Sequence, residues 1–341
     1  MKKTTALALL GTSALVAAIV KSAAQRTKFS FRNRSVLITG GSRGLGLVLA
    51  RLLAKEGARL MIVSRETKSL EAAQTELEAA GATVPIKACD IRDRDRAKEA
   101  VESTINQFGS IDVLINNAGV IQVGPIEHMR IEDFENAMAT HAWAPLHMIL
   151  AAIPHMRGQG GGRIVNISSI GGKLALPHMA PYSMSKFALS GISDGMRSEL
   201  SQHRIYVTSV YPGLMRTGSH VNANFKGRHS KEFTWFSLMA ALPIFSIGAR
   251  RAARQIIEAC RGGRPELIIT TQARMAVIGS AIFPGLTARA MRLMNALLPK
   301  ATANASPRSQ PGWGSTSAWS PSPLTRLADQ AISENNEDVA A

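Results

Sequence analysis

Short apolar runs recur along the middle of the chain, separated by longer stretches with helical periodicity. Each run is five to seven residues long and rich in Val, Ile and Leu, which is typical of strands buried on both faces of a sheet. We predict seven strands, at Ser35–Thr39, Arg59–Ser64, Val84–Ala88, Ile111–Asn116, Arg163–Ser168, Ile205–Tyr211 and Glu266–Thr270.

The stretches between these runs have the period of helices that cover a sheet with one apolar face. We predict helices at Leu45–Glu56, Lys68–Ala80, Asp93–Phe108, Ile131–Met156, Tyr182–His203 and Gly248–Arg261. Strands joined through helices pair in parallel by right-handed crossovers. The pattern therefore predicts an α/β fold, a single doubly wound domain at about residues 35–272. Its sheet should be parallel and mainly seven-stranded, with helices on both faces.

Two segments follow this domain. Residues 273–300 mix Met, Leu, Ile, Val and Phe with three arginines. They fit either a helical pair packed on the domain or an amphipathic extension at a membrane surface. Residues 301–341 are rich in Ser, Pro, Ala and Asn, and we predict a disordered tail there.

Composition excludes several classes of protein. With 341 residues, 45% of them hydrophobic and 19% charged, the chain can bury a large core and is not disordered as a whole. Two cysteines, Cys89 and Cys260, are too few for a disulfide scaffold or a zinc finger and fit a reducing compartment. We predict no metal site.

The charge of the chain is strongly positive and unevenly distributed. The formal net charge is +16, of which residues 1–34 contribute +7, residues 35–225 +2, residues 226–300 +9 and residues 301–341 −2. The basic segments flank a nearly neutral domain and are apolar in pattern. This distribution favours contact with a membrane over contact with nucleic acid.

An uncharged segment lies near the N-terminus. Thr4–Val20 would span about 25 Å as a helix, close to the lower limit for crossing a bilayer. The alternative is a cleaved secretory signal, but Lys21 follows the run directly and Ser22-Ala23-Ala24 is a poor cleavage site. Five basic residues at positions 21–34 outnumber those before the run. We therefore predict that residues 1–34 are a retained anchor and basic linker, with a membrane-associated domain facing the cytoplasm.

A glycine-rich turn joins the first predicted strand to its helix. The string Thr39-Gly40-Gly41-Ser42-Arg43-Gly44-Leu45-Gly46 has the spacing Gly-x-x-x-Gly-x-Gly. Glycines at such a junction let the backbone approach a pyrophosphate, whose charge the N–H groups at the start of the helix can bind. The turn therefore predicts a dinucleotide site.

The end of the second predicted strand selects the dinucleotide. Proteins that bind NAD place an acidic residue there for the adenosine ribose, whereas this strand ends in Ser64-Arg65. Arg65 and Arg43 offer planar donors suited to a ribose 2′-phosphate, so we predict NADP(H) as the cofactor. In the alternative, both arginines are ordinary solvated charges and Glu66 is a displaced acid.

Further motifs follow in a fixed order. They are Asn116-Asn117-Ala118-Gly119 and Ser168-Ser169 at the ends of strands, Tyr182-Ser183-Met184-Ser185-Lys186 in a helix, and Tyr211-Pro212-Gly213. With the glycine turn, they resemble the short-chain dehydrogenase/reductase family across about residues 35–270. The resemblance implies a Rossmann domain and hydride transfer between a nicotinamide dinucleotide and an alcohol or carbonyl compound.

Tyr182 and Lys186 indicate chemistry independently of the resemblance. Because they are four residues apart, both lie on one helical face. An ammonium about 4 Å from the phenol would lower the pKa of Tyr182 by about three units, which would poise it near neutrality for acid–base catalysis. Ser169, at the end of the fifth strand, is placed to hold a substrate carbonyl.

The resemblance assigns roles to individual residues. Tyr182 would donate the proton to the carbonyl oxygen, Lys186 would also hold the nicotinamide ribose, and Ser169 would orient the substrate. The implied cofactor contacts are Thr39, Gly40, Ser42, Arg43, Gly44, Leu45, Gly46, Arg65, Asp90 at the adenine with Ile91 beside it, Asn117, Ala118, Gly119, Tyr182, Lys186, Pro212, Gly213 and Thr217 at the carboxamide.

One position departs from the family pattern. Such proteins usually carry an Asn in the helix after the fourth strand, where it holds a water of a proton relay. The alignment places His141 there, and Asn136 is five positions away. Either an imidazole nitrogen of His141 binds that water, or the relay is altered.

A long segment at residues 213–248 lies where this family builds its substrate lid. Its large apolar residues are Phe225, Phe233, Trp235, Phe236, Leu238, Met239, Leu242, Ile244 and Phe245. If they line the site, they favour a lipophilic ketone or alcohol. In the alternative, they pack beneath the lid or face another subunit or the bilayer.

These observations predict an NADP(H)-dependent oxidoreductase that interconverts a carbonyl and a secondary alcohol, with a small apolar molecule as its substrate. A homo-oligomer is compatible with them. One alternative is a non-catalytic dinucleotide-binding membrane protein. Another is an epimerase or dehydratase that uses the same Tyr182 and Lys186.

Overall fold

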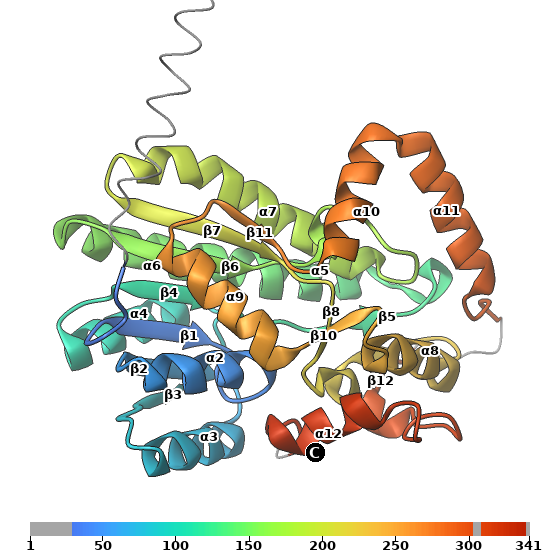
Figure 1. Cartoon of the computed structure of the whole chain (residues 1–341), viewed down its shortest axis with the longest axis horizontal. Helices are drawn as coiled ribbons and strands as arrows, with labels where there is room; N and C mark the ends of the chain where they lie inside the picture. The colour runs from blue at the N-terminus through green and yellow to red at the C-terminus, as the bar shows by residue number, and fades with distance from the viewer. Residues whose placement is uncertain (1–28, 303–307, 339–341) are drawn as a thin grey trace, which may run out of the picture. The chain divides into compact units, whose positions relative to one another are not determined.

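A seven-stranded parallel sheet forms the centre of the unit that comprises residues 31–341 (Figure 1). The computed structural model describes residues 29–302 and 308–338. The strands lie in the order β11-β7-β6-β4-β1-β2-β3. Their bounds are β1 (Ser35–Thr39), β2 (Arg59–Ser64), β3 (Ile86–Ala88), β4 (Val113–Asn116), β6 (Gly162–Ile167), β7 (Ile205–Tyr211) and β11 (Glu266–Ile268). Because β1 lies between β2 and β4, the strand order reverses there, and ligands of such sheets bind beyond the carboxyl ends of the strands at that point.

Helices cover both faces of the sheet, which confirms the predicted doubly wound architecture. Their bounds are α2 (Gly44–Lys55), α3 (Thr67–Ala79), α4 (Arg94–Phe108), α5 (Ile131–Met138), α6 (Ala144–Gly158), α7 (Ala180–Ser201) and α9 (Ala249–Arg261). Helix α2 packs against α3 and α9, and α4 packs against α6. Leu37, Leu114 and Ile164 of the strands meet Ala100 and Met148 in one buried cluster.

A π-helical turn interrupts the predicted helix at Ile131–Met156. It comprises Ala139–Trp143 and separates α5 from α6. Pro145 follows this turn and has no N–H to donate to the carbonyl of His141, so a regular helical hydrogen bond cannot form there.

In the described part of the chain, five short strands lie outside the large sheet. Their bounds are β5 (Gln122–Val123), β8 (Leu214–Arg216), β9 (Asn224–Phe225), β10 (Ser246–Gly248) and β12 (Gln310–Pro311), and helix α8 (His229–Ala241) lies between β9 and β10. Strand β9 pairs with β5 and β12, and β8 pairs with β10. In the predicted lid, Phe225, Phe233 and Phe236 form a buried cluster, whereas Ile244 and Phe245 are exposed.

The prediction of a disordered tail is wrong for residues 308–338. They form β12, a 3-10 turn at Gly312–Gly314 and helix α12 (Arg326–Glu334). Gly312 donates its N–H to the carbonyl of Ala223, and a Cβ on Gly218 would lie 2.7 Å from the carbonyl oxygen of Ala331. Small residues thus let backbones meet at close range, an effect that composition does not reveal.

The segment at 273–300 forms two helices, α10 (Thr271–Ile282) and α11 (Pro284–Leu297), which form a hairpin (Figure 1). Ala273 is the one buried residue of the pair. The hairpin exposes large apolar side chains, at Met275, Ile278, Ile282, Phe283, Leu286, Leu293 and Leu297. One of the two interpretations required these apolar side chains to pack on the domain. They are exposed instead, so that interpretation is wrong for them.

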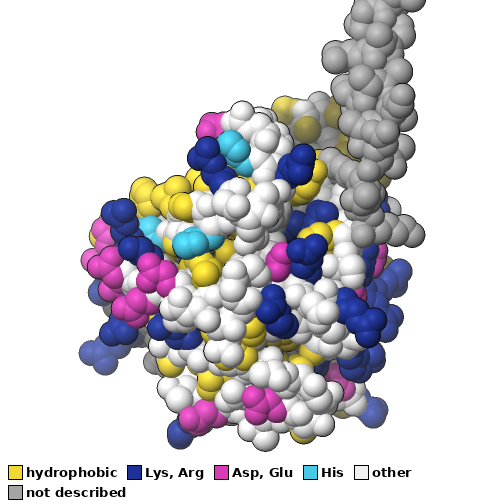
Figure 2. All heavy atoms as spheres, turned by 90° about the vertical axis from the view of Figure 1, so that its left-hand side faces the viewer, with side chains coloured by type: hydrophobic (Ala, Val, Ile, Leu, Met, Phe, Trp, Pro, Cys, Tyr) yellow, Lys and Arg dark blue, Asp and Glu magenta, His cyan; other side chains and the backbone are white. Residues whose placement is uncertain are grey.

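Helices in the part of the chain that the structure describes are too short or too polar to cross a membrane. The predicted anchor at Thr4–Val20 lies outside the described residues. On the face shown in Figure 2, Lys and Arg side chains are interspersed with Asp and Glu. The positive charge of the protein is therefore not gathered into one basic surface on this face.

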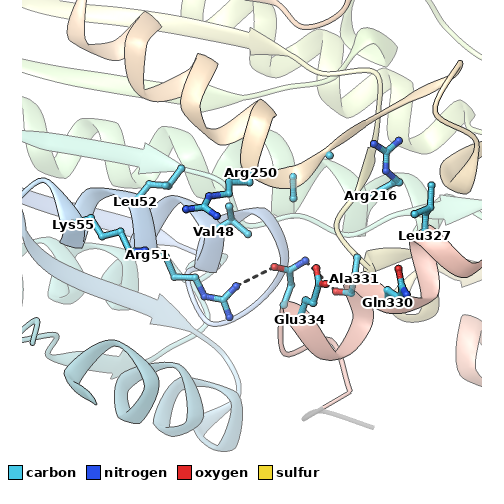
Figure 3. A pocket seen from close by; sticks show the side chains of 13 residues that line it. Val48, Arg51, Leu52, Lys55, Arg216, Arg250, Leu327, Gln330, Ala331 and Glu334 are labelled. Atoms are coloured by element: carbon cyan, nitrogen blue, oxygen red, sulfur yellow. Dashed lines mark hydrogen bonds between the residues drawn. The ribbon is translucent and has the colours of Figure 1, made fainter. Parts of the chain in front are cut away.

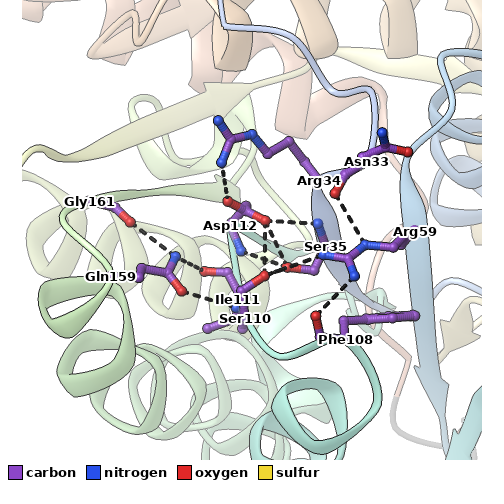
Figure 4. Close-up of polar contacts among 10 residues, drawn as sticks. All are labelled: Asn33, Arg34, Ser35, Arg59, Phe108, Ser110, Ile111, Asp112, Gln159 and Gly161. Atoms are coloured by element: carbon purple, nitrogen blue, oxygen red, sulfur yellow. Dashed lines mark hydrogen bonds and ion pairs between the residues drawn. The ribbon is translucent and has the colours of Figure 1, made fainter.

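A buried carboxylate ties the sheet to its flanking segments at the amino ends of β1 and β4 (Figure 4). Asp112 accepts hydrogen bonds from the Ser35 N–H at 2.9 Å, the Ser35 hydroxyl at 2.9 Å and Arg34 Nη1 at 2.7 Å. Burial acts to raise the pKa of Asp112, but these hydrogen bonds outweigh it, and the net pKa lies below its ordinary value of 3.8.

We expect Asp112→Ala to lower the free energy of unfolding by about 2–4 kcal/mol at pH 7, since it leaves buried donors without their acceptor. Because the folded-state pKa of Asp112 is depressed, its contribution is present above the unfolded pKa and is lost as the pH falls through the folded pKa. Urea unfolding of both proteins at pH 7 and pH 3 measures this. Equal stabilities at pH 7 would contradict it.

Candidate active site

A cavity of about 380 Å³ opens at the carboxyl ends of the central strands. The loops after β1, β2, β3, β4, β6 and β7 line it. Every predicted catalytic residue lies in its wall, and so do the predicted cofactor contacts except Thr39 and Gly46. The structure therefore brings together residues from six separate loops.

The glycine turn adopts a backbone conformation that side chains disfavour. Gly40 has φ +63° and Gly44 has φ +56°. A Cβ on Gly46 would lie 2.0 Å from the carbonyl oxygen of Gly40, so the third glycine lets the turn fold back on its own helix. Helix α2 begins without a side-chain cap, which suits the binding of phosphate at its N-terminus.

Thr39 and Asn117 hold this turn against the neighbouring strand. The Asn117 side chain donates to the carbonyl oxygens of Thr39 at 3.1 Å and Gly40 at 3.0 Å. The Thr39 hydroxyl accepts from the N–H groups of Asn117 at 3.0 Å and Ala118 at 3.1 Å. Both residues therefore shape the cofactor end of the cavity. Thr39 is 1% exposed and does not line the cavity itself, but it holds the residues that do.

The adenosine end of the cavity carries two arginines, Arg65 and Arg43, and two acids that are paired with arginines. Arg65 is exposed, and among the described residues it forms no hydrogen bond or ion pair. Arg43 lies 3.6 Å from the carboxylate of Glu337. Asp90 accepts hydrogen bonds from Arg92, which hold its pKa below the usual range. Ser42 accepts a hydrogen bond from Ser69, and Ile91 is buried.

Tyr182 lies in the first turn of α7, and its side chain lies next to Ser169, which follows β6. Burial raises the pKa of Tyr182 above 10, although a hydrogen bond with the Ser169 hydroxyl opposes the rise. Ser169 also accepts the Gly171 N–H at 3.1 Å. The expected lowering of the pKa by Lys186 does not occur here.

Lys186 explains this difference. Its ammonium lies 5.6 Å from the centre of the Tyr182 ring and donates to the carbonyl oxygen of Ile167 at 2.9 Å. Burial lowers the pKa of Lys186 to about 7. At neutral pH the lysine is therefore a weaker source of positive charge than an exposed one would be.

His141 is built into the wall, and both of its ring nitrogens have partners. Nε2 accepts the Val120 N–H at 3.1 Å, so Nδ1 carries the proton of the neutral ring and donates to Ser185 Oγ at 2.7 Å. The Ser185 hydroxyl in turn donates to the carbonyl oxygen of Tyr182. Burial and the charge of Lys186 hold the pKa of His141 well below 6.5.

Of the two interpretations of His141, this arrangement contradicts the one in which an imidazole nitrogen binds a relay water, because both ring nitrogens already have protein partners. The ring instead stands edge-on to Tyr182, at 5.4 Å between ring centres and 84° between planes. His141 therefore positions the phenol, both by ring contact and through Ser185.

Several residues of the site have no signal in the sequence. Asn222 and Glu337 line the cavity, although each lies in a segment that carries no recognisable motif. Beneath the floor, the Asn116 side chain donates to Asn166 at 2.8 Å, and Asn166 donates to Ser193 at 2.8 Å. Such polar pairs become visible only when the strands are in register.

Apolar side chains in the wall of the cavity include Ile121, Leu176, Met179, Leu214, Phe236 and Ala240. The lid segment also contributes polar residues to the wall, among them Ser219, His220 and Asn224. The sequence analysis named nine large apolar residues in the lid. Among the described residues, Phe236 is the one of these nine that lines the cavity. Thr217 lines the cavity and is 3% exposed.

Comparisons with known proteins agree with this geometry. A family profile described as short chain dehydrogenase matches residues 34–226. The chain is 35% identical to gluconate 5-dehydrogenase of Gluconobacter oxydans over 189 residues, which cover 55% of this chain and 74% of that protein. It is 30% identical to fatty acyl-CoA reductase of Acinetobacter baylyi over 278 residues, 80% of this chain and 88% of that protein.

Among solved structures, L-sorbose reductase from Gluconobacter frateurii, complexed with NADPH and L-sorbose, superposes with a TM-score of 0.64. It is 25% identical in sequence, and the match covers 71% of this chain and 97% of that one. The family match covers more than half of the chain and includes the glycine turn and the motifs around Ser169 and Tyr182. The protein belongs to the short-chain dehydrogenase/reductase family, whose members use a nicotinamide dinucleotide to oxidise alcohols or reduce carbonyl compounds.

Proposed function

We propose that the protein is an NADP(H)-dependent oxidoreductase that interconverts a lipophilic carbonyl compound and a secondary alcohol. One observation carries the proposal: Tyr182, Ser169 and Lys186 share a single cavity with the glycine turn and with Arg65. The residues present fit the dinucleotide, because the glycines at positions 40 and 44 have positive φ and α2 begins without a side-chain cap. When bound, the dinucleotide supplies or accepts the hydride.

The protein's own residues manage the proton. A phenol whose pKa is raised keeps its proton at neutral pH, so Tyr182 Oη is a proton donor for carbonyl reduction. The Ser169 hydroxyl, next to the phenol, would hold the carbonyl oxygen. Lys186, with a pKa of about 7, can carry a proton to or from this pair near neutrality.

The direct test follows NADPH absorbance with purified protein and a panel of carbonyl compounds. Long-chain aliphatic ketones are expected to be turned over faster than L-sorbose, since Ile121, Leu176 and Met179 offer a ketose few hydrogen bonds. The similarity to fatty acyl-CoA reductase supports this choice. Turnover confined to sugars would contradict the lipophilic substrate but leave the reaction class in place.

We expect Arg65→Ala to weaken NADPH binding by about tenfold and to leave NADH binding nearly unchanged. The Arg65 guanidinium lines the cavity and forms no ion pair among the described residues, and a charge-assisted phosphate contact contributes about 1.5–3 kcal/mol. Titration of tryptophan fluorescence with each dinucleotide measures both affinities. Equal binding of NADPH and NADH by the wild-type protein would contradict the cofactor assignment.

We also propose that the protein associates with membranes through Thr4–Val20 and through the α10–α11 hairpin. Met275, Phe283, Leu293 and Leu297 of the hairpin are each more than half exposed. Residues 226–300 carry 12 basic against 3 acidic residues, so anionic lipid would complement this segment. The domain would then act at a lipid surface facing the cytoplasm.

A protein lacking residues 1–28 should sediment with vesicles of anionic phospholipid and be released by high salt. Replacing Leu293 and Leu297 with Glu should abolish this binding, because it places two charges on the apolar face. Ile131→Glu, at an exposed apolar residue of α5, is the control. Binding that survives the double replacement would show that the hairpin is not the contact.

A second exposed apolar surface could bind another copy of the chain. Trp143, Met184 and Phe187 are each 42–52% exposed on the π-helical turn and α7, which pack together. We propose a homo-oligomer through this face. Light scattering of the wild type and of Phe187→Lys tests it.

A further inference from the structure

The C-terminal segment reaches back to the glycine turn. The Gly44 N–H, at the start of α2, donates to the carbonyl oxygen of Asn335 at 2.9 Å. The carboxylate of Glu337 lies beside the same glycine, with Oε1 2.6 Å from the position that a Cβ on Gly44 would take. Glu337 is 2% exposed and lines the wall of the cofactor cavity.

The predicted lid segment holds Glu337 in this place. Asn222 donates through Nδ2 to Glu337 Oε2 at 2.7 Å and to the Glu337 carbonyl oxygen at 2.9 Å. Asn335 donates to the carbonyl oxygen of Thr217 at 3.2 Å. The segment therefore bridges the lid and the glycine turn and places an acidic side chain between them.

The charged surroundings of Glu337 are those of an anion site. Arg43, the residue before the start of α2, lies 3.6 Å from its Oε2. Asp338 adds a negative charge next to it in sequence. Arg43 is also one of the two arginines that we assign to the 2′-phosphate, and the start of α2 is the position of the diphosphate. Glu337 thus uses the groups that a phosphate of the cofactor would use.

Helix α12 lines a second cavity, separate from the cofactor cavity. This cavity, of about 510 Å³, separates α12 from α2 and α9, with Lys55, Arg216 and Arg250 around it (Figure 3). Across this space Arg51 donates to Asn335 Oδ1 at 3.1 Å.

We infer that Glu337 is a specificity-determining residue of the cofactor site, whose carboxylate competes with the phosphates of the dinucleotide for Arg43 and the glycine turn. This inference rests on the proposed use of NADP(H). An ionised Glu337 weakens the binding of either dinucleotide, and it weakens NADPH binding more than NADH binding, because only NADPH carries the 2′-phosphate.

The protonation of Glu337 gives this competition a pH dependence. Burial raises the pKa of Glu337 to about 7, with Arg43 and Asn222 opposing the rise and Asp338 adding to it. The carboxyl is neutral below that pH and ionised above it, so the competition appears as the pH rises. Lys186, with a pKa of about 7, also loses positive charge over this range. The informative quantity is therefore the difference between the wild type and a variant at the same pH.

The test measures dissociation constants of NADPH and NADH at pH 6 and pH 8.5 for the full-length wild type, Glu337→Gln and Glu337→Ala. Glu334→Gln is the matched control, since Glu334 lies three residues away, is exposed and faces the other cavity. At pH 8.5 we expect both Glu337 variants to bind NADPH about tenfold more tightly than the wild type, with a smaller gain for NADH. At pH 6 the gain should shrink, and Glu334→Gln should match the wild type throughout.

Unchanged or weaker NADPH binding by Glu337→Gln at pH 8.5 would overturn the inference, and so would an equal gain at both pH values. Glu337→Ala guards against an effect of the new amide on Asn222. A preference for NADH in all proteins would refute the proposed cofactor instead. Tighter NADH binding by the Glu337 variants would then still show competition at the diphosphate.

Discussion

Tyr182→Phe should lower the rate of carbonyl reduction by about 10²–10⁴-fold, because it removes the hydroxyl that we propose donates the proton beside Ser169. NADPH affinity should change little, since the Tyr182 ring remains and continues to stand edge-on to His141. The loss should therefore appear in kcat rather than in the dissociation constant of the cofactor. Single-turnover NADPH oxidation and a separate binding titration measure the two quantities.

Tyr206→Phe is the matched control for this replacement. Tyr206 lies on β7 with its ring 5.1 Å from the guanidinium of Arg163, and it does not line the cavity. It loses the same hydroxyl without touching the site, so its activity should equal that of the wild type. Substantial reduction by a folded Tyr182→Phe protein would show that another acid supplies the proton.

Lys186→Met should damage both catalysis and cofactor binding. We expect turnover to fall by at least about 10²-fold, because Lys186 is the titrating group next to Tyr182. NADPH should also bind more weakly, since a positive charge is lost from the wall of the cavity. Lys98→Met, at an exposed lysine of α4, controls for the loss of charge in general.

The same replacement should stabilise the folded protein at low pH. The pKa of Lys186 falls from 10.5 to about 7 on burial, so holding it protonated costs folding free energy. That cost is absent above the unfolded pKa, grows as the pH falls, and is complete below the folded pKa. The advantage of Lys186→Met in urea unfolding should therefore be larger at pH 6 than at pH 10. A variant that is less stable at pH 6 would indicate that the bond to Ile167 outweighs the buried charge.

The parallel sheet could be predicted because its strands are buried on both faces and appear as continuous apolar runs. Ser35–Thr39, Arg59–Ser64 and Ile205–Tyr211 have the predicted bounds, while other strands are shorter or shifted by a residue. The site residues Ser169, Tyr182 and Lys186 could be assigned because their motifs occupy fixed positions relative to these strands. Local pattern and topology agree at these points.

Protonation states could not be predicted in the same way. The spacing of Tyr182 and Lys186 is a property of one helix, whereas their burial depends on α7, β6 and the lid together. Burial reverses the expected direction for Tyr182. His141 has two hydrogen-bond partners, Val120 and Ser185. They likewise come from segments that are far apart in the sequence.

The C-terminal segment was missed because its contacts depend on backbone fit rather than on hydrophobicity. Gly312 and Gly218 allow close approach, and Asn335 and Asn222 provide hydrogen bonds over distances of more than one hundred residues. A composition rich in Ser, Pro and Asn is common to disordered tails and to segments of this kind.

The pairing of β12 with β9 has a consequence for the order of events during synthesis. The ribosome makes the glycine turn early and residues 308–338 after every strand of the large sheet. The strands of the sheet and the glycine turn are therefore available for pairing in the nascent chain before α12 is made. The turn that we propose binds the phosphates of the dinucleotide is therefore made before Glu337, the residue that we propose competes for it.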